Sequence, residues 1–257
     1  MKQERLTPSS VAAPRASGLA ALWRLPAVTV ARFALRSYLR SGWLWGEVVY
    51  VLAFFGVFWY YPSDESYFFS VAGEGLGVLA IVGTVVLVRR AMSARVYLTL
   101  ARLPTRASLT RGLALATGAV RLPMLVLLMG LILGLHRVDH TSASDVLLGG
   151  LGMLANSVVV STLTLALCSP MATRTIRMIF LVWLVAALAS PLSAGIFEAT
   201  LRVARWPILP LAAASTLGTL HSLAWYDLWP LPVLALYVLG LAWLAERWLA
   251  RRDLILH

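Results

Sequence analysis

Six apolar stretches, each close to the length of a membrane-spanning helix, dominate this sequence. A helix needs roughly 20 apolar residues to cross about 30 Å of hydrocarbon, where every backbone polar group must also be paired internally. The composition agrees: 60% of the 257 residues are hydrophobic and 13% are charged, whereas soluble domains have about 45–50% apolar and about 25% charged residues. We therefore expect an all-α polytopic membrane protein with a single membrane domain over residues 43–257. Its six transmembrane helices are predicted at about 43–61, 69–88, 113–135, 146–168, 178–197 and 229–249.

The segment before the first span has two parts. Residues 1–22 are rich in Ser, Ala and Pro, and we expect a flexible cytoplasmic tail there. Residues 23–42 repeat apolar and basic positions at helical spacing, which predicts an amphipathic helix lying in the membrane interface. The alternative for this segment is a solvated basic linker. The apolar face of the predicted helix includes Leu35 and Tyr38. Its basic face includes Arg32, Arg36 and Arg40.

Basic residues are concentrated on one side of the predicted spans. If the N-terminus is cytoplasmic, the inner segments hold 18 of the Lys and Arg residues and the outer segments hold three. Cytoplasmic loops carry such an excess, so both termini are expected in the cytoplasm of a multi-pass protein of the cell (inner) membrane. The net charge of +11 is thereby assigned to membrane topology, and no nucleic-acid partner is expected.

The outer segment before the last span is long and mostly apolar. Residues 206–225 contain Pro207, Pro210 and Gly218, which interrupt regular helix. A seventh span there would place the Arg-rich C-terminus outside and break the charge asymmetry. We expect re-entrant or interfacial helices instead, with their irregular backbone covered by protein.

Residues 89–111 form the longest internal stretch that we expect to lie in water on the basic side. An apolar and a basic stripe run along it at helical spacing: Val96, Leu100 and Leu103, and Arg95, Thr99 and Arg102. Pro104 lacks a backbone N–H and disfavours helix at Leu103, so a short amphipathic helix should end there. This helix is either a docking element for another protein or a positive-inside anchor without a partner.

Four polar residues lie inside predicted spans, where they are costly and often functional: Glu47, Arg121, Asn156 and Glu246. We expect Arg121 to pair with Glu47 or Glu246. Alternatively, each charged side chain extends to the inner membrane interface and places its charged group in water. Asn156 begins a polar streak in the fourth span. That streak serves either helix–helix hydrogen bonding or a central pathway.

The motifs of common enzymes are missing from the sequence. It contains no phosphate-binding G-x-x-x-x-G-K-[ST], no H-E-x-x-H and no G-x-S-x-G. Its only metal-like pattern is H-R-V-D-H, in which His136 and His140 could share a helical face. We favour a solvated loop for that pattern, because both histidines flank a turn and the sequence offers no third ligand. We expect no catalytic site, no cofactor and no metal in this chain.

The chain resembles the membrane subunits of ABC-2 type transporters in three places: the basic helix entering the first span, VARFALRSYLRSGWLWGEV, the loop after the second span, SARVYLTLARLPTRASLTRGLAL, and the six-span plan with a long outer segment before the last span. The resemblance covers essentially the whole chain after residue 23. It implies a permease subunit, expected to be an exporter, that binds two separate ATPase subunits and a second permease copy or a homologous permease within membrane lipid. ATP and Mg would bind to the ATPases.

The resemblance also implies roles for particular residues. The ATPase-coupling helix of the family corresponds to about residues 94–103, and its elbow helix corresponds to residues 23–42. The residues implied are Arg95, Val96, Leu98, Leu100, Arg102, Leu103 and Pro104 for coupling, and Arg32, Leu35, Arg36 and Arg40 for the elbow. Two alternatives remain, namely a membrane scaffold or regulatory subunit without transport, and a metal- or redox-binding membrane subunit that uses His136 and His140. The substrate is not specified by the sequence.

Overall fold

The computed structural model describes residues 26–92, 106–138, 142–168, 172–189, 206–219 and 225–250. These residues are helical apart from turns and one isolated bridge between Ser63 and Val138, which confirms the expected all-helical fold for the described part of the chain. The helices are α2 (Pro26–Arg40), α3 (Trp43–Phe58), α4 (Glu65–Ala91), α6 (Arg106–Gly134), α7 (Ala143–Leu167), α8 (Arg174–Ala189), α10 (Leu209–Ser215) and α11 (Pro230–Ala250). Three short 3-10 helices are η3 (Trp206–Ile208), η4 (Leu217–Thr219) and η5 (Trp225–Leu228).

Four of these helices, α4, α6, α7 and α11, are long and apolar enough to cross a membrane. The bent pair α2 and α3 gives a fifth if the two helices are counted as one span. Helix α3 alone has 16 residues, or about 24 Å at 1.5 Å per residue, which is shorter than the hydrocarbon core. Helix α8 is described only as far as Ala189, so the remainder of the predicted span 178–197 lies outside the described residues.

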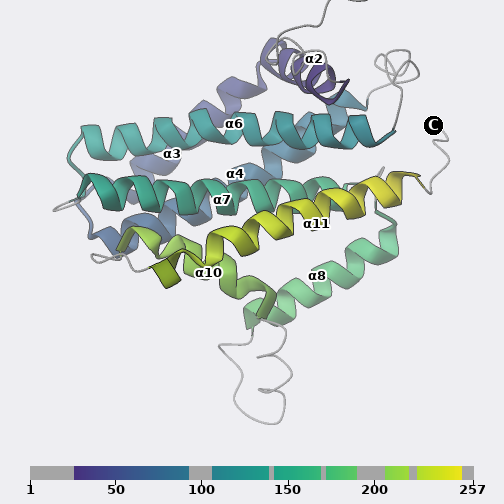
Figure 1. Ribbon diagram of the computed structural model, residues 1–257. Coiled ribbons are helices and arrows are strands. Elements are labelled where there is room, and N and C mark those ends of the chain that lie inside the picture. The colour runs from purple at the N-terminus through teal and green to yellow at the C-terminus, as the bar shows by residue number, and fades with distance from the viewer. Residues whose placement is uncertain are drawn as a thin grey trace, which may run out of the picture.

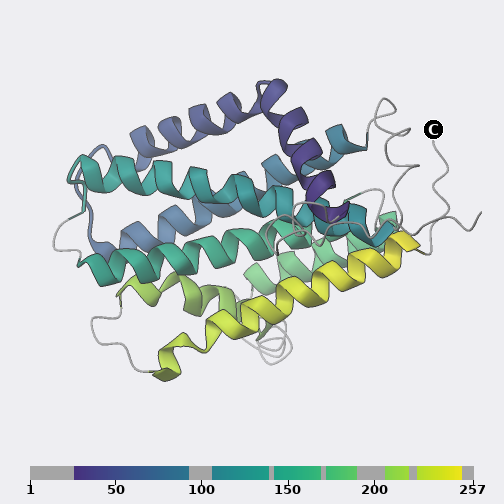
Figure 2. The same ribbon diagram turned by 45° about the horizontal axis from the view of Figure 1, so that its top comes forward.

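The long helices form a bundle in which successive helices run in opposite directions (Figure 1). Helix α7 lies at its centre and contacts α4, α6, α10 and α11. The C-terminal ends of α4, α7 and α11 and the N-terminal end of α6 lie at one end of the bundle, where α2 also lies (Figures 1 and 2). At the other end, Arg137 Nη1 donates to the carbonyl of Tyr60 at 3.0 Å and ties the loop after α3 to the end of α6.

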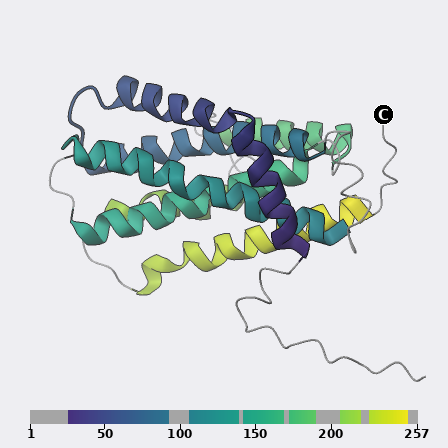
Figure 3. The ribbon, with the colours of Figure 1, turned by 90° about the horizontal axis from the view of Figure 1, so that it is seen from above.

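Helix α2 crosses the bundle instead of continuing into α3 (Figure 3). The two helices meet at 70°. The turn between them contains Gly42, whose φ of 76° lies in the left-handed region that favours glycine. The amide groups of Ser41 and Gly42 bond back to the carbonyls of Tyr38 and Leu39, which closes the end of α2.

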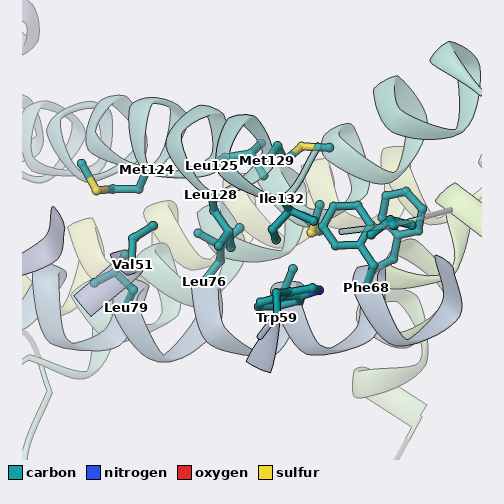
Figure 4. Packing of buried hydrophobic residues seen from close by; sticks show 14 residues of the cluster. Val51, Trp59, Phe68, Leu76, Leu79, Met124, Leu125, Leu128, Met129 and Ile132 are labelled. Carbon is teal, nitrogen blue, oxygen red and sulfur yellow. The ribbon is translucent and has the colours of Figure 1, made fainter. Parts of the chain in front are cut away.

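Close helix packing at the bundle centre is aided by large apolar side chains. One cluster joins α3, α4 and α6 through Val51, Trp59, Phe68, Leu76, Leu128 and Ile132 (Figure 4). A second cluster joins α2 to α4 and α6, and a third joins α7 to α10 and α11. Gly152 of α7 lies against the Ala214 carbonyl of α10, so closely that a Cβ would overlap it. Small residues permit such backbone contact between membrane helices.

The described parts of the segment before the last span form short helices, and none of them is long enough to cross a membrane. Here α10 and η4 pack on α7. Pro210 is at the beginning of α10, where its missing N–H costs no helical bond. The predicted short helices are therefore present in the described part of this region.

Candidate functional site

The candidate site is a buried charge cluster where α2, α3, α4 and α6 meet. Arg121 lies near the middle of α6, and Glu47 lies in the second turn of α3. Arg121 Nη2 donates to Glu47 Oε1 at 2.6 Å, and the two side chains are 2% and 4% exposed. The sequence left Glu47 and Glu246 open as partners of Arg121, and the structure selects Glu47.

Tyr38 extends this cluster to α2. Its hydroxyl donates to the same Oε1 atom of Glu47 at 2.6 Å, and its side chain is 1% exposed. Sequence periodicity had placed Tyr38 on the apolar face of the predicted elbow helix, and its phenol was not predicted to bond a carboxylate. The sequence signal that could have predicted this bond is a tyrosine on the apolar face of a helix, nine residues before Glu47, a carboxylate inside a predicted span.

Helix α4 provides the space for the ion pair at Gly83. A Cβ at this position would overlap both the Glu47 carboxylate and the Arg121 guanidinium. Gly83 has no positive φ, so its small size matters here and its conformational freedom does not. Within the described residues, Glu47 Oε2 and the Nε and Nη1 atoms of Arg121 have no hydrogen-bond partner. The pair is thus deeply buried and only partly satisfied.

Glu246 has a different partner. Arg111 Nε and Nη2 donate to its two carboxylate oxygens at 2.6 and 3.0 Å, and the Arg111 side chain is 64% exposed. The contact joins α11 to α6 at the end of the bundle where α2 lies. An exposed ion pair of this kind contributes little to stability, because water screens its charges, unlike those of the buried pair.

Asn156 joins α7 to α10. Its Nδ2 donates to the carbonyl of Leu211 at 2.8 Å. The neighbouring hydroxyls of Ser157, Thr162 and Thr164 donate to carbonyls of their own helix. Among the described residues, the polar streak of the fourth predicted span is therefore used largely within and beside α7.

Helix α2 has the apolar and basic faces that the sequence predicts. Arg32, Arg36 and Arg40 are exposed, whereas Leu35 is half-buried. The buried face packs on α6, where a Cβ at Gly112 would overlap Val30 and the Ala27 carbonyl. Figure 3 shows α2 crossing over the N-terminal half of α6.

The predicted coupling residues lie outside the described residues, which resume at 106. These are Arg95, Val96, Leu98, Leu100, Arg102, Leu103 and Pro104. Helix α6 begins at Arg106, directly after this segment.

The H-R-V-D-H pattern is described only in part. His136 adopts a positive φ of 50° just after α6, whereas Asp139 and His140 lie outside the described residues. No group of three metal-type side chains occurs among the residues that the structure describes. The proposed metal role of His136 and His140 gains no support from this part of the chain.

Cys168, the single cysteine, follows the last residue of α7. Burial raises the pKa of its thiol to about 11, although Arg177 and Arg89 nearby act in the opposite direction. A thiol with this pKa is protonated at neutral pH and is a poor nucleophile. Cys168 is therefore a half-buried, weakly nucleophilic thiol at the end of α7.

Comparison with known proteins adds no relative: no family model, no curated protein and no solved structure matches this chain.

Proposed function

We propose that this chain is the membrane-spanning subunit of an ABC-2 type transporter. It works as an exporter with two separate ATPase subunits and a second permease copy or a homologous permease. ATP and Mg bind to those ATPases, and the segment 94–103 receives their motion. The proposal draws on the sequence resemblance, and the arrangement of α2, α3 and α6 supports it.

The observation that carries the proposal is the linkage between α2 and α6. Helix α2 lies across α6, and Tyr38 of α2 shares the Glu47 oxygen that binds Arg121 of α6. Because α6 begins directly after the predicted coupling segment, a push on that segment would move α6, α2 and the start of α3 together. That is the mechanical connection that a subunit driven by an external ATPase requires.

The partly satisfied ion pair supports a role beyond stability. A buried pair repays its desolvation cost only when its remaining donors and acceptors are also bonded. Three such atoms of Glu47 and Arg121 lack partners in the described part of the chain. A contact of this kind is better suited to fixing one arrangement of α3 relative to α6 than to maximising stability.

The membrane topology in this proposal has six spans and two cytoplasmic termini. One end of the bundle gathers helix ends that carry arginines (Figure 1): Arg89 and Arg90 of α4, Arg106 and Arg111 of α6, and Arg247 of α11. That end is assigned to the cytoplasm of the cell (inner) membrane. Helices α3 and α8 complete the six spans, and α10 with η4 lies in the outer leaflet as a re-entrant or interfacial unit.

The test uses the tagged full chain, purified in a mild detergent from membranes of the organism that encodes it. We expect an ATPase with a phosphate-binding loop to co-purify and to hydrolyse ATP. The Arg95→Glu/Arg102→Glu variant should lose that ATPase, because four units of charge change on the proposed docking face. The matched control, Arg5→Glu/Arg15→Glu, makes the same charge change in the predicted tail and should retain it.

Two results would contradict the proposal. One is a wild-type preparation that contains stable partners but no ATP turnover, which is the behaviour of a scaffold or regulator. The other is full ATPase retention by the Arg95→Glu/Arg102→Glu variant, which would remove the docking role of this segment. A colourless, metal-free preparation would further argue against a redox subunit.

A further inference from the structure

A cavity of about 510 Å³ lies between α7, α8, α10 and α11. Its lining includes Val159, Leu163, Phe180, Trp183, Leu211 and Tyr237. Among the described residues that line it, none is charged, and Tyr237 has the single hydroxyl group. Small-molecule sites have volumes of about 300–1,000 Å³, so the cavity is large enough for a ligand.

Helix α8 forms the outer wall of this cavity. It runs obliquely across the side of the bundle opposite α2 (Figures 1 and 2). Phe180 and Trp183 line the cavity, whereas Met178, Ile179 and Val182 are more than half exposed. Apolar residues therefore lie on both sides of the wall. A cavity of this character disfavours water and favours an apolar occupant.

One end of the cavity is flanked by arginines. Arg177 lies one helical turn before Phe180 on α8, and Arg247 lies one turn after the lining residue Leu244 on α11. Arg174 adds a further cation to α8, and all three arginines are exposed. None of them forms an ion pair with another residue that the structure describes. The apolar cavity thus has a cationic rim, which is the charge complement of an anionic headgroup.

The Arg247 guanidinium lies 4.4 Å from the ring centre of Trp243. Stacking of this kind holds the side chain near the apolar surface while its N–H groups stay available for a phosphate. The nearest acid on α11, Glu246, is bonded to Arg111 of α6. The rim therefore keeps its positive charge.

We propose that the cavity holds an acyl chain of an anionic phospholipid, whose phosphate is bound by Arg174 and Arg177 with Arg247 beside them. The expected occupant is amphipathic because the site is amphipathic: the apolar cavity lies beside cations that form no ion pair with the described residues. The inference needs only that the chain is embedded in a membrane. It does not depend on the proposed transport function.

Gly240 provides the first test. It lines the cavity, and a Cβ built on it meets no atom within 4 Å, so a larger side chain can enter the space without a backbone clash. Gly240→Leu should lower the phospholipid retained by the purified full chain, counted by native mass spectrometry, about tenfold, because two groups cannot fill one volume. The matched control is Gly130→Leu on α6, an exposed glycine with equally open surroundings that should retain wild-type lipid.

The headgroup is tested by adding phosphatidylglycerol or phosphatidylcholine vesicles of the same acyl composition to delipidated protein. Wild-type protein should retain the anionic lipid in preference, and Arg174→Gln/Arg177→Gln should lose that preference. The control Arg5→Gln/Arg15→Gln removes two arginines from the predicted N-terminal tail and should keep it. Equal retention of both lipids by wild-type protein would overturn the headgroup assignment.

A third measurement needs no variant. Phosphatidylglycerol with a diazirine in its acyl chain should label Phe180, Trp183 or Tyr237 after illumination, since these residues line the cavity. Labelling confined to the outer residues Met178, Ile179 and Val182 would overturn the proposal. So would a Gly240→Leu protein that keeps its lipid but loses a homo-oligomer, because a second copy would then fill the cavity.

Discussion

Removal of one partner of the buried ion pair should destabilise the protein far more than removal of both. Glu47 and Arg121 are 4% and 2% exposed and are joined at 2.6 Å. Arg121→Met leaves a buried carboxylate whose remaining partner is the Tyr38 hydroxyl, and Glu47→Gln leaves a buried cation. Such half-broken pairs cost about 3–5 kcal/mol, whereas replacement of both charges is often nearly neutral.

The expected shift can be stated for a thermal assay. With about 2–4 °C per kcal/mol for a chain of this size, each single variant should lose roughly 6–20 °C in apparent Tm. The double variant, Glu47→Gln/Arg121→Met, should recover most of that loss because no unpaired charge remains. The measurement is thermal unfolding followed by tryptophan fluorescence in one lipid nanodisc composition, for all variants.

A control comes from the same helix. Arg111→Met also removes an arginine from a carboxylate, but the Arg111 side chain is 64% exposed, so the loss should stay below about 1 kcal/mol. If Arg121→Met shifts the Tm no further than Arg111→Met, the pair is not the buried contact described above. A double variant whose loss equals the sum of the two single losses would refute the charge argument as well.

Two further predictions concern packing and reactivity. Gly152→Ala should destabilise the protein because the added Cβ would overlap the Ala214 carbonyl. Gly130→Ala is the control: its surroundings are open, so it should raise stability by about 0.5–1 kcal/mol through helix propensity. Equal shifts in apparent Tm for the two variants would contradict the contact between α7 and α10. Maleimide labelling of Cys168 at pH 7.5 should be about 100-fold slower than labelling of a thiol with the ordinary pKa of 9.0, because the pKa of Cys168 is raised to about 11. The labelling rate of Cys168 should rise with pH up to about pH 11. An exposed cysteine from Thr175→Cys in a Cys168→Ser background should label rapidly, and a similar rate for Cys168 would contradict its raised pKa.

The long helices could be predicted because their length and apolar content are properties of contiguous residues. Helix ends were less accessible to the same reasoning. The third apolar stretch was predicted from residue 113, whereas α6 begins at Arg106. Hydropathy reports which residues suit hydrocarbon, and a helix continues into water until a turn signal ends it.

The contacts between helices required the structure. Apolar patterning identified Glu47 and Arg121 as costly residues in a membrane, but the choice between Glu47 and Glu246 depends on which helices are neighbours and how each is rotated. The small residue Gly83 and the phenol of Tyr38 complete the cluster, and neither has a local pattern that links it to a charge. The 70° bend at Gly42 likewise depends on a single backbone conformation.

The wide sequence separation of the ion pair has a consequence for biosynthesis. Glu47 and Arg121 are 74 residues apart, so translation at about 5–20 residues per second separates their emergence by roughly 4–15 s. A charge inside a span adds to the cost of insertion, by about 2.5–3.5 kcal/mol at the centre, and Glu47 lies in the second turn of α3. During that interval, the α3 carboxylate is without its cation and must remain hydrated. In the six-span arrangement proposed above, stable integration of α3 is therefore completed by a later helix, and truncation of a nascent chain before Arg121 should leave α3 loosely held at the insertion machinery.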